Sequence, residues 1–202
     1  STDPLAAHGY TTQSPIAAGA FSMIVRAVDN TSGKQVAVKT FNKAKVQKDP
    51  SLWQVTCREI SVLQHLNSSF HPHLANLLAL HDNPISVHLV LEYCDGASLQ
   101  RVLQKLGVNI GMAENKVAEL TAHLCSGLGH VHSQGIAHRD VKPSNVVFVT
   151  AGDGRESVKM VDFGFAIRCG DERCYTNCST PIYMAPEQNK SKPAYLGPPV
   201  DC

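Results

Sequence analysis

The first ninety residues consist mainly of short apolar runs separated by turn residues. Runs of this kind, bounded by glycine, proline, asparagine or aspartate, are typical of β-strands. Four of them are expected to be strands: 16–27, 35–39, 77–81 and 87–91. Between the second and the third, apolar residues recur at near-helical spacing over 51–66, which predicts a helix with Ser51 as its N-cap. Residues 1–15 carry no periodic pattern and are expected to form a flexible leader.

The second half of the chain combines helical and strand patterns. Four further elements are expected there: helices over 98–106 and 113–132, and strands over 146–149 and 157–161. A loop with a glycine at each end, 107–111, joins the two helices. The two strands are joined by a turn that contains Asp153 and Gly154, so we expect a β-hairpin.

Composition narrows the classes of partner. The chain has 202 residues, of which 43% are hydrophobic and 17% charged, and this is enough apolar material for a folded core. A formal net charge of +1 provides no electrostatic attraction for nucleic acid. No apolar run reaches the roughly 18 residues that a membrane span needs, and no secretory pattern opens the chain. We therefore expect neither nucleic acid nor a membrane as a partner.

The seven cysteines are odd in number and scattered along the chain. Without a secretory signal, we expect reduced thiols in an intracellular protein, in the cytoplasm or alternatively in the nucleus. Cys169, Cys174 and Cys178 lie close together in the sequence. Their spacing is not the paired C-x-x-C of a zinc site, and no histidine lies among them, so a metal role is disfavoured.

One charged segment, HRDVKPSN at 138–145, carries a carboxylate, a lysine and a carboxamide within six residues: Asp140, Lys142 and Asn145. The segment lies between a predicted helix and a predicted strand. A loop that is held between two packed elements is a usual position for catalytic groups. His-Arg-Asp alone is equally well explained as a charged turn, but Lys142 and Asn145 at their spacing favour a catalytic loop.

Several other motifs accompany this loop in a fixed order along the chain. They are a V-A-V-K strand ending at Lys39, a helix with Glu59, a strand running into E-Y-C at 92–94, D-F-G at 162–164, and T-P-I-Y-M-A-P-E at 180–187. Taken together, these motifs resemble those of the eukaryotic protein kinases, and the resemblance covers about residues 16–202.

The resemblance implies an α+β, two-lobed fold. A small lobe of antiparallel strands with one main helix would extend over 16–92. A mainly helical large lobe would begin at 93 and continue to 202, where Val200, Asp201 and Cys202 resemble the beginning of its central D-x-W helix. The large lobe would therefore be incomplete, and we expect this sequence to be a fragment of a longer kinase.

The resemblance also implies binding of ATP and Mg²⁺. Lys39, held by Glu59, would orient the α- and β-phosphates. Asp162 and Asn145 would hold Mg²⁺, since both are oxygen donors of the kind that a hard cation prefers. A lysine at the end of an apolar strand needs such a partner, because burying an unpaired charge is costly.

Three further residues would act on the protein substrate. Asp140 would accept the hydroxyl proton, and Lys142 would neutralise the γ-phosphate. Thr180 would bridge the two and close the acceptor pocket around a small hydroxyl. D-x-K-P-x-N is the serine/threonine form of the motif, so the expected substrates are proteins with Ser or Thr acceptors.

The glycine-rich loop departs from the kinase pattern. G-x-G-x-F-G-x-V falls on 17–24, where only Gly19 is kept and Ala17 and Ser22 replace the other glycines. Because glycine lets the backbone approach phosphate closely, we expect weaker nucleotide binding rather than none. The resemblance assigns nucleotide contacts to Ile16, Ala17, Ala18, Gly19, Ala20, Phe21, Ser22, Ile24, Ala37, Lys39, Leu91, Glu92, Cys94, Val147 and Asp162.

Regulation is expected to involve Arg139 and Thr176. An arginine beside the catalytic aspartate would bind a phosphate group on the activation segment through charge-assisted hydrogen bonds. Thr176 matches the usual site that an upstream kinase phosphorylates. The alternative is that Thr176 is an unmodified loop residue. Serine at positions 98 and 144, where other kinases carry glutamate, predicts no strong requirement for arginine in the substrate.

Two other functions remain open for this chain. A pseudokinase or scaffold is favoured slightly by Ala17 and Ser22, although Lys39, Asp140 and Asp162 are all present. Alternatively, the chain is a fragment that is inactive by itself because its large lobe is incomplete.

Overall fold

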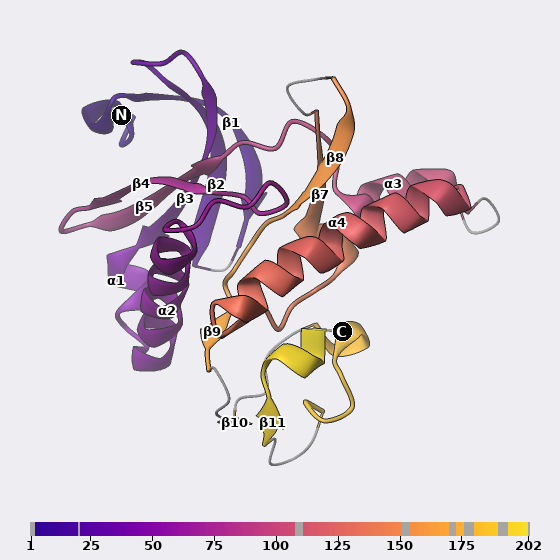
Figure 1. Cartoon of the computed structure of the whole chain (residues 1–202). Coiled ribbons are helices and arrows are strands. Elements are labelled where there is room, and N and C mark those ends of the chain that lie inside the picture. The colour runs from indigo at the N-terminus through magenta and orange to yellow at the C-terminus, as the bar shows by residue number, and fades with distance from the viewer. Residues whose placement is uncertain are drawn as a thin grey trace. The chain divides into compact units, whose positions relative to one another are not determined.

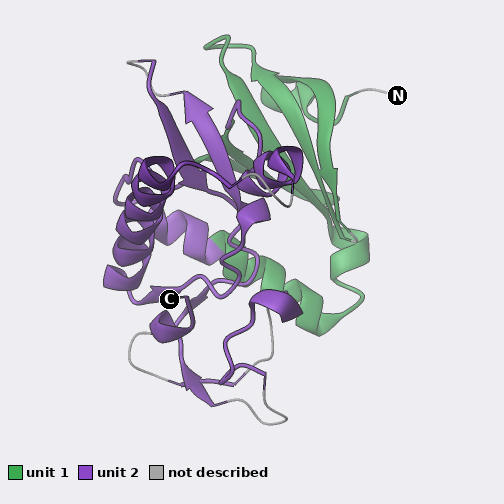
Figure 2. Cartoon of the chain, turned by 90° about the vertical axis from the view of Figure 1, so that its right-hand side faces the viewer, with its two compact units in different colours: residues 1–60, 75–93 green, residues 61–74, 94–202 purple. Residues whose placement is uncertain are grey.

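A computed structural model describes residues 3–19, 21–107, 111–150, 154–169, 173–175, 180–189 and 194–201 (Figure 1). The chain forms two compact units, Ser1–Ile60 with Ala75–Tyr93 and Ser61–Leu74 with Cys94–Cys202 (Figure 2). Helix α2 (Pro50–Leu66) begins in the first unit and ends in the second. Each unit contains its own strands and its own buried apolar cluster.

A five-stranded antiparallel sheet forms most of the first unit (Figure 1). Its strands are β1 (Tyr10–Ala18), β2 (Ser22–Asp29), β3 (Gln35–Asn42), β4 (Leu77–Asp82) and β5 (Ser86–Glu92), in the spatial order β1-β2-β3-β5-β4. The predicted strands in β3, β4 and β5 are confirmed. The single strand predicted over 16–27 is wrong, because the chain reverses near Gly19, whose N–H donates to the Ser22 carbonyl at 2.8 Å. Short helices η1 (Ala6–His8) and α1 (Lys43–Val46) complete the unit together with α2.

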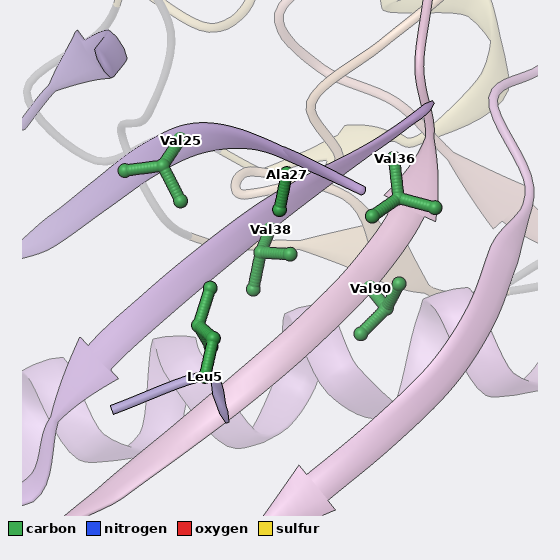
Figure 3. Packing of buried hydrophobic residues seen from close by; sticks show 6 residues of the cluster. All are labelled: Leu5, Val25, Ala27, Val36, Val38 and Val90. Carbon is green, nitrogen blue, oxygen red and sulfur yellow. The ribbon is translucent and has the colours of Figure 1, made fainter. Parts of the chain in front are cut away.

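The N-terminal residues belong to this sheet and its core. Residues 3–15 are not the flexible leader that the sequence predicted, since β1 pairs along β2 and Leu5 is only 2% exposed. Leu5 packs against one face of the sheet in an apolar cluster (Figure 3), whose buried members are Leu5, Val25, Ala27, Val36, Val38 and Val90. The Asp3 carboxylate accepts a hydrogen bond from the N–H of Thr12 at 2.9 Å and so fixes the start of the chain. One leucine followed by an edge strand with mostly exposed side chains produces no periodic pattern. The sequence therefore did not predict strand β1 as a separate element.

The helix predicted over 51–66 is confirmed as α2, but the cap differs from the prediction. Asp49 Oδ1 accepts hydrogen bonds from the N–H of Ser51 at 2.9 Å and from its hydroxyl at 2.7 Å, so the side chain of Asp49 satisfies one free N–H group of the first turn. The helix then presents Glu59 on its buried side, where this residue is 3% exposed.

The described part of the second unit contains two long helices and three two-stranded sheets (Figure 1). The helices are α3 (Leu99–Leu106) and α4 (Glu114–Ser133), and the paired strands are β6 (Ile136–Ala137) with β9 (Ile167–Arg168), β7 (Val146–Thr150) with β8 (Glu156–Met160), and β10 (Arg173–Cys174) with β11 (Tyr195–Leu196). The two predicted helices and the predicted strand pair are confirmed. Short helical turns are η2 (Pro143–Asn145), η3 (Pro181–Tyr183) and η4 (Pro198–Asp201).

Helix α4 packs closely against strand β8. A side chain on Gly127 would lie 3.4 Å from Met160 Cε and 3.3 Å from Leu74 Cδ2, which explains a glycine in the middle of a helix. The apolar cluster between the helices and the hairpin contains Leu120, Val146, Phe148 and Val158. The predicted α+β class is confirmed. Among the described residues, we find no helix with the length and apolar character needed to cross a membrane.

Candidate active site

The segment 138–145 connects β6 to β7 within the second unit and ends in the helical turn η2. Its first three residues are almost completely buried: His138 is 1% exposed, and Arg139 and Asp140 are each 2% exposed. Burial of a charged segment requires polar partners for each group. Later parts of the chain supply several of these partners, namely Phe165, Thr180, Tyr195 and Asp201.

The carboxylate of Asp140 is the centre of a hydrogen-bond network. Its Oδ1 accepts from the hydroxyl and the N–H of Thr180, at 2.9 and 3.1 Å. Its Oδ2 accepts from Asn145 Nδ2 at 3.0 Å and forms an ion pair with Lys142 Nζ at 2.7 Å. Lys142 Nζ also donates to the Thr180 hydroxyl at 2.7 Å. The structure therefore brings four of the predicted site residues together.

The backbone of this loop is held by Asp201, which is 6% exposed. Its Oδ2 accepts from the N–H of His138 at 2.7 Å and its Oδ1 from the N–H of Arg139 at 2.6 Å. A third contact joins Oδ2 to His132 Nε2 at 2.9 Å. Arg139 has φ = 65°, a conformation that is unfavourable for a residue with a side chain. The hydrogen bonds from the N–H groups of His138 and Arg139 to Asp201 offset this cost.

The side chain of Arg139 connects the loop to later parts of the second unit. Its Nε donates to the carbonyl of Phe165 at 2.8 Å, and Nη1 donates to the hydroxyl of Tyr195 at 3.2 Å. Tyr195 lies on β11 and is 2% exposed. The predicted partner Thr176 lies outside the described residues, so its pairing with a phosphate stays a prediction.

Asp162 follows β8 after one residue and is exposed. It has φ = 66°, and its Oδ1 accepts from the N–H of Gly164 at 3.2 Å. The N–H of the preceding Val161 donates to the carbonyl of Asn145 at 2.9 Å, which joins the two predicted Mg²⁺ ligands through one backbone contact. Strain at a functional position is a common feature of binding sites.

The pKa of His138 depends on burial and on the charges around the loop. Burial lowers its pKa, and the negative charges of Asp201, Asp162 and Asp140 oppose that effect without reversing it. The imidazole is thus neutral at pH 7, and its Nδ1 accepts from the N–H of Asp140 at 3.3 Å. Its ring packs on Phe163, with the ring centroids 5.0 Å apart. The negative charges of Asp140 and Asp162 therefore both raise the pKa of the same residue, His138.

In the first unit, Lys39 and Glu59 form the predicted ion pair. Lys39 Nζ lies 2.6 Å from Glu59 Oε1, and the two residues are 7% and 3% exposed. Lys39 comes from β3 and Glu59 from α2. A buried lysine keeps its charge only with such a partner, so this pair fixes the ammonium group at one position.

Four of the predicted nucleotide contacts in the first unit share one face of the sheet. Ile24 pairs with Lys39 across β2 and β3, and Ala37 pairs with Leu91 across β3 and β5. Since side chains alternate along a strand, these four lie on the face opposite to Val36 and Val38. Glu92 ends β5 and accepts a hydrogen bond from Asn76 Nδ2 at 2.8 Å.

The remaining predicted nucleotide contacts occupy two places. Residues 16–19, 21 and 22 surround the turn between β1 and β2, where Ile16 and Phe21 are 48% and 47% exposed, and Ala20 lies outside the described residues. Cys94, Val147 and Asp162 belong to the second unit. Their roles as ligand contacts stay predictions.

Sequence reasoning missed two residues of this region, Asp201 and Tyr195. Both contact the loop from more than fifty positions later in the chain. The sequence offered one usable signal for Asp201, because the resemblance placed it at the start of the D-x-W helix, but no role followed from its position. No sequence pattern indicated a role for Tyr195.

The chain is similar to known proteins along most of its length. The family model of the protein kinase domain matches residues 10–202. Among curated proteins, serine/threonine-protein kinase 33 of Mus musculus is 32% identical over 178 residues, which is 84% of this chain and 35% of that protein. Ribosomal protein S6 kinase 2 alpha of Gallus gallus is 33% identical over 181 residues, 89% of this chain and 22% of that protein. A probable myosin light chain kinase of Dictyostelium discoideum is 31% identical over 179 residues, 88% of this chain and 54% of that protein. The chain thus spans about a fifth to a half of the length of these relatives.

Proposed function

The chain belongs to the protein kinase family, and from this premise we propose that it transfers the γ-phosphoryl group of ATP to Ser or Thr hydroxyls of protein substrates. The observation that carries the proposal is the hydrogen-bond network of Asp140, Lys142, Asn145 and Thr180. Phosphoryl transfer needs mainly positioning and neutralisation of charge, and this network supplies a carboxylate base beside a fixed cation.

Asp140 would act as the base for the substrate hydroxyl. Its Oδ1 is held by the Thr180 hydroxyl, and its Oδ2 by Lys142 and Asn145, so the carboxylate has one orientation before substrate arrives. Lys142 lies where it would neutralise charge on the phosphoryl group that is transferred. Thr180, bonded to both, would limit the acceptor to a small hydroxyl, which supports Ser and Thr over Tyr.

Asn145 and Asp162 suit the role of Mg²⁺ ligands. The Asn145 amide nitrogen donates to both Asp140 O and Oδ2, so the carbonyl oxygen of this side chain is the donor left for a metal. The described residues include no group of three or more His, Cys, Asp or Glu able to bind a metal ion on its own. Mg²⁺ would therefore be shared with the phosphate oxygens of ATP, whose charge it would neutralise.

Lys39 would bind the α- and β-phosphates, with Glu59 holding its ammonium group in place. The predicted contacts Ile24, Ala37 and Leu91 share its face of the sheet and would cover the nucleotide. Arg139 would receive a phosphate on Thr176, added by an upstream kinase. A kinase with this function would act inside the cell, because it uses ATP.

Transfer of labelled phosphate from ATP to a mixed Ser/Thr peptide substrate tests the proposal. Removal of a general base lowers rates by about 10²- to 10⁴-fold, so Asp140→Asn should reduce transfer by at least the lower of these values. Asp82→Asn is the matched control, since Asp82 is an exposed acid on β4 outside the site. Equal rates for Asp140→Asn and the unaltered chain would contradict the proposal.

A second candidate function is nucleotide binding without turnover. Ala17 and Ser22 in place of two glycines favour it, since they reduce the freedom of the turn near Gly19. ATP binding by a chain that transfers no phosphate to any Ser/Thr peptide would decide for this alternative.

A further inference from the structure

Four histidines gather where the loop between α2 and β4 meets helix α4, all within the second unit. His71 and His73 come from the loop, and His123 and His130 from α4. The rings of His73 and His123 stack with centroids 4.1 Å apart, and those of His71 and His130 stack at 5.0 Å. His71 and His73 are themselves 5.6 Å apart. These four residues are called the histidine cluster.

The hydrogen bonds of His71 require a neutral ring. Its Nδ1 accepts from the N–H of His73 at 3.3 Å, and its Nε2 lies 3.2 Å from the hydroxyl of Ser126 on α4. A proton added at Nδ1 would turn this acceptor into a donor that faces another donor. The loop contact is therefore lost when His71 becomes charged.

The two histidines on α4 differ in their hydrogen bonding. His123 Nδ1 is buried and has no hydrogen-bond partner among the described residues, so a proton on that nitrogen would have no acceptor. His130 Nε2 contacts the Ser69 carbonyl and hydroxyl, both at 3.1 Å, which joins the loop to α4 a second time. Charging both members of a stacked pair would place two cations within about 5 Å of each other.

Besides burial, the groups that lower the pKa of the loop histidines are neighbouring imidazoles and the Lys159 ammonium group on β8. Burial lowers the pKa of His71, and His130, His73 and Lys159 add to the effect. Burial likewise lowers the pKa of His73, with further lowering by His123 and Lys159, while a hydrogen bond to the Val158 carbonyl partly opposes it. At neutral pH both rings are uncharged, and on acidification the unfolded or detached loop binds protons first.

The loop supports the strand that leads to Asp162. The N–H of Met160 donates to the carbonyl of His73 at 2.8 Å, and Lys159 Nζ donates to the carbonyl of Leu74 at 3.3 Å. His73 Nδ1 contacts the Val158 carbonyl at 3.0 Å. Strand β8 is thus tied to the loop on one side and to β7 on the other, and Asp162 follows β8 after one residue.

We propose that the histidine cluster is a proton-operated clasp, which holds the α2–β4 loop against α4 and β8 when its imidazoles are neutral and releases the loop when they are protonated. A metal site does not explain the cluster, since the rings stack face to face and no group of such residues among those described is arranged to hold a metal ion. Release would loosen the support of β8 just before Asp162, so acidification would reach the candidate active site through this strand.

Hydrogen–deuterium exchange of the intact chain at pH 7.5 and 5.5, corrected for the intrinsic rate, tests the clasp. The amide N–H groups of His73 and Met160 are bonded within the clasp. Their protection should be lower at pH 5.5 than at pH 7.5, because a protonated His71 can no longer accept a hydrogen bond from the N–H of His73. Protection in helix α3, which carries no histidine, is the internal reference. Unchanged protection at both amides would overturn the proposal.

His123→Phe sharpens the test, since it keeps an aromatic ring against His73 but cannot be charged. It should lessen the loss of protection at Met160 at pH 5.5, whereas the matched control His65→Gln, which removes a histidine of α2 outside the cluster, should lose protection as the unaltered chain does. Equal acid sensitivity of both variants would overturn the proposal.

NMR titration of the unaltered chain provides a readout that does not depend on the folding of any variant. His71 and His73 should titrate below the ordinary pKa of 6.5, because burial and neighbouring cations disfavour their charged forms. Titration of both at or above 6.5 would contradict the clasp. None of these readouts requires phosphoryl transfer, so a failure of the clasp is distinguishable from a failure of the proposed function.

Discussion

Two turns of the chain that are both assigned to ATP chemistry differ sharply in how they are held. Residues 138–140 and Asn145 of the loop 138–145 are buried, and groups from η4, β11 and the segment before η3 fix its side chains and backbone. The turn near Gly19 lies between exposed strand ends, and the described backbone contact across it is one hydrogen bond to Ser22. The charged groups of the loop each have several contacts. Under the proposed function, the turn near Gly19 would only have to follow the shape of a phosphate chain, and it would then tolerate replacement of its glycines. The comparison predicts that substitutions in the buried site cost far more stability than substitutions in the turn.

The largest effect on stability is expected at the buried ion pair. Glu59→Leu removes the partner of a 7% exposed lysine and should lower the free energy of unfolding by about 3–5 kcal/mol. The double variant Lys39→Met, Glu59→Leu removes both charges and should recover most of this loss. Denaturant unfolding measures all three proteins. A double variant as unstable as Glu59→Leu would show that packing, and not charge, is what this pair contributes.

A somewhat smaller effect is expected at Asp201. Asp201→Ala leaves the buried N–H groups of His138 and Arg139 without their acceptor, which should cost about 2–3 kcal/mol. Asp201→Asn retains one acceptor oxygen and should cost less. If Asp201→Ala unfolds at the same denaturant concentration as the unaltered chain, the loop is held by other contacts.

Acid should weaken the first unit through His88, which is 1% exposed. Burial lowers its pKa, and His8 and His81 add to this effect, so the unfolded chain takes up the proton first. Stability should therefore be complete above pH 6.5 and decline as the pH falls below it. Thermal unfolding between pH 7.5 and 5.5 measures the decline, and His88→Phe should reduce it. A stability that rises on acidification would contradict the assigned direction.

The smallest effect on stability is expected in the turn. Ala17→Gly and Ser22→Gly together should change the free energy of unfolding by about 1 kcal/mol or less, because both sites lie at strand ends beside the exposed turn. The same change should tighten ATP binding, since the backbone gains freedom to approach the phosphates. Equilibrium binding of ATP with Mg²⁺ measures it. Weaker binding by the glycine variant would show that the smaller loop is adapted to another ligand.

The sequence predicted those parts of the molecule that depend on local patterns. The helix over 51–66, the two helices of the second unit and the pair Lys39 and Glu59 follow from apolar spacing and from short motifs. The part that it missed depends on contacts between distant positions. Leu5 has no periodic neighbours, yet it fills one face of the sheet, and Asp201 holds a loop that lies more than sixty positions earlier. Such contacts depend on the folded backbone, so no local pattern carries them.

A double-mutant cycle of phosphoryl transfer tests the central claim, which is that Asp140 and Thr180 act as one unit. Rates of transfer from labelled ATP to a Ser/Thr peptide would be measured for the unaltered chain, Asp140→Asn, Thr180→Val and the double variant. Residues that act together are strongly non-additive, so the double variant should be no slower than Asp140→Asn alone. Additive losses, or no transfer by the unaltered chain, would contradict the claim.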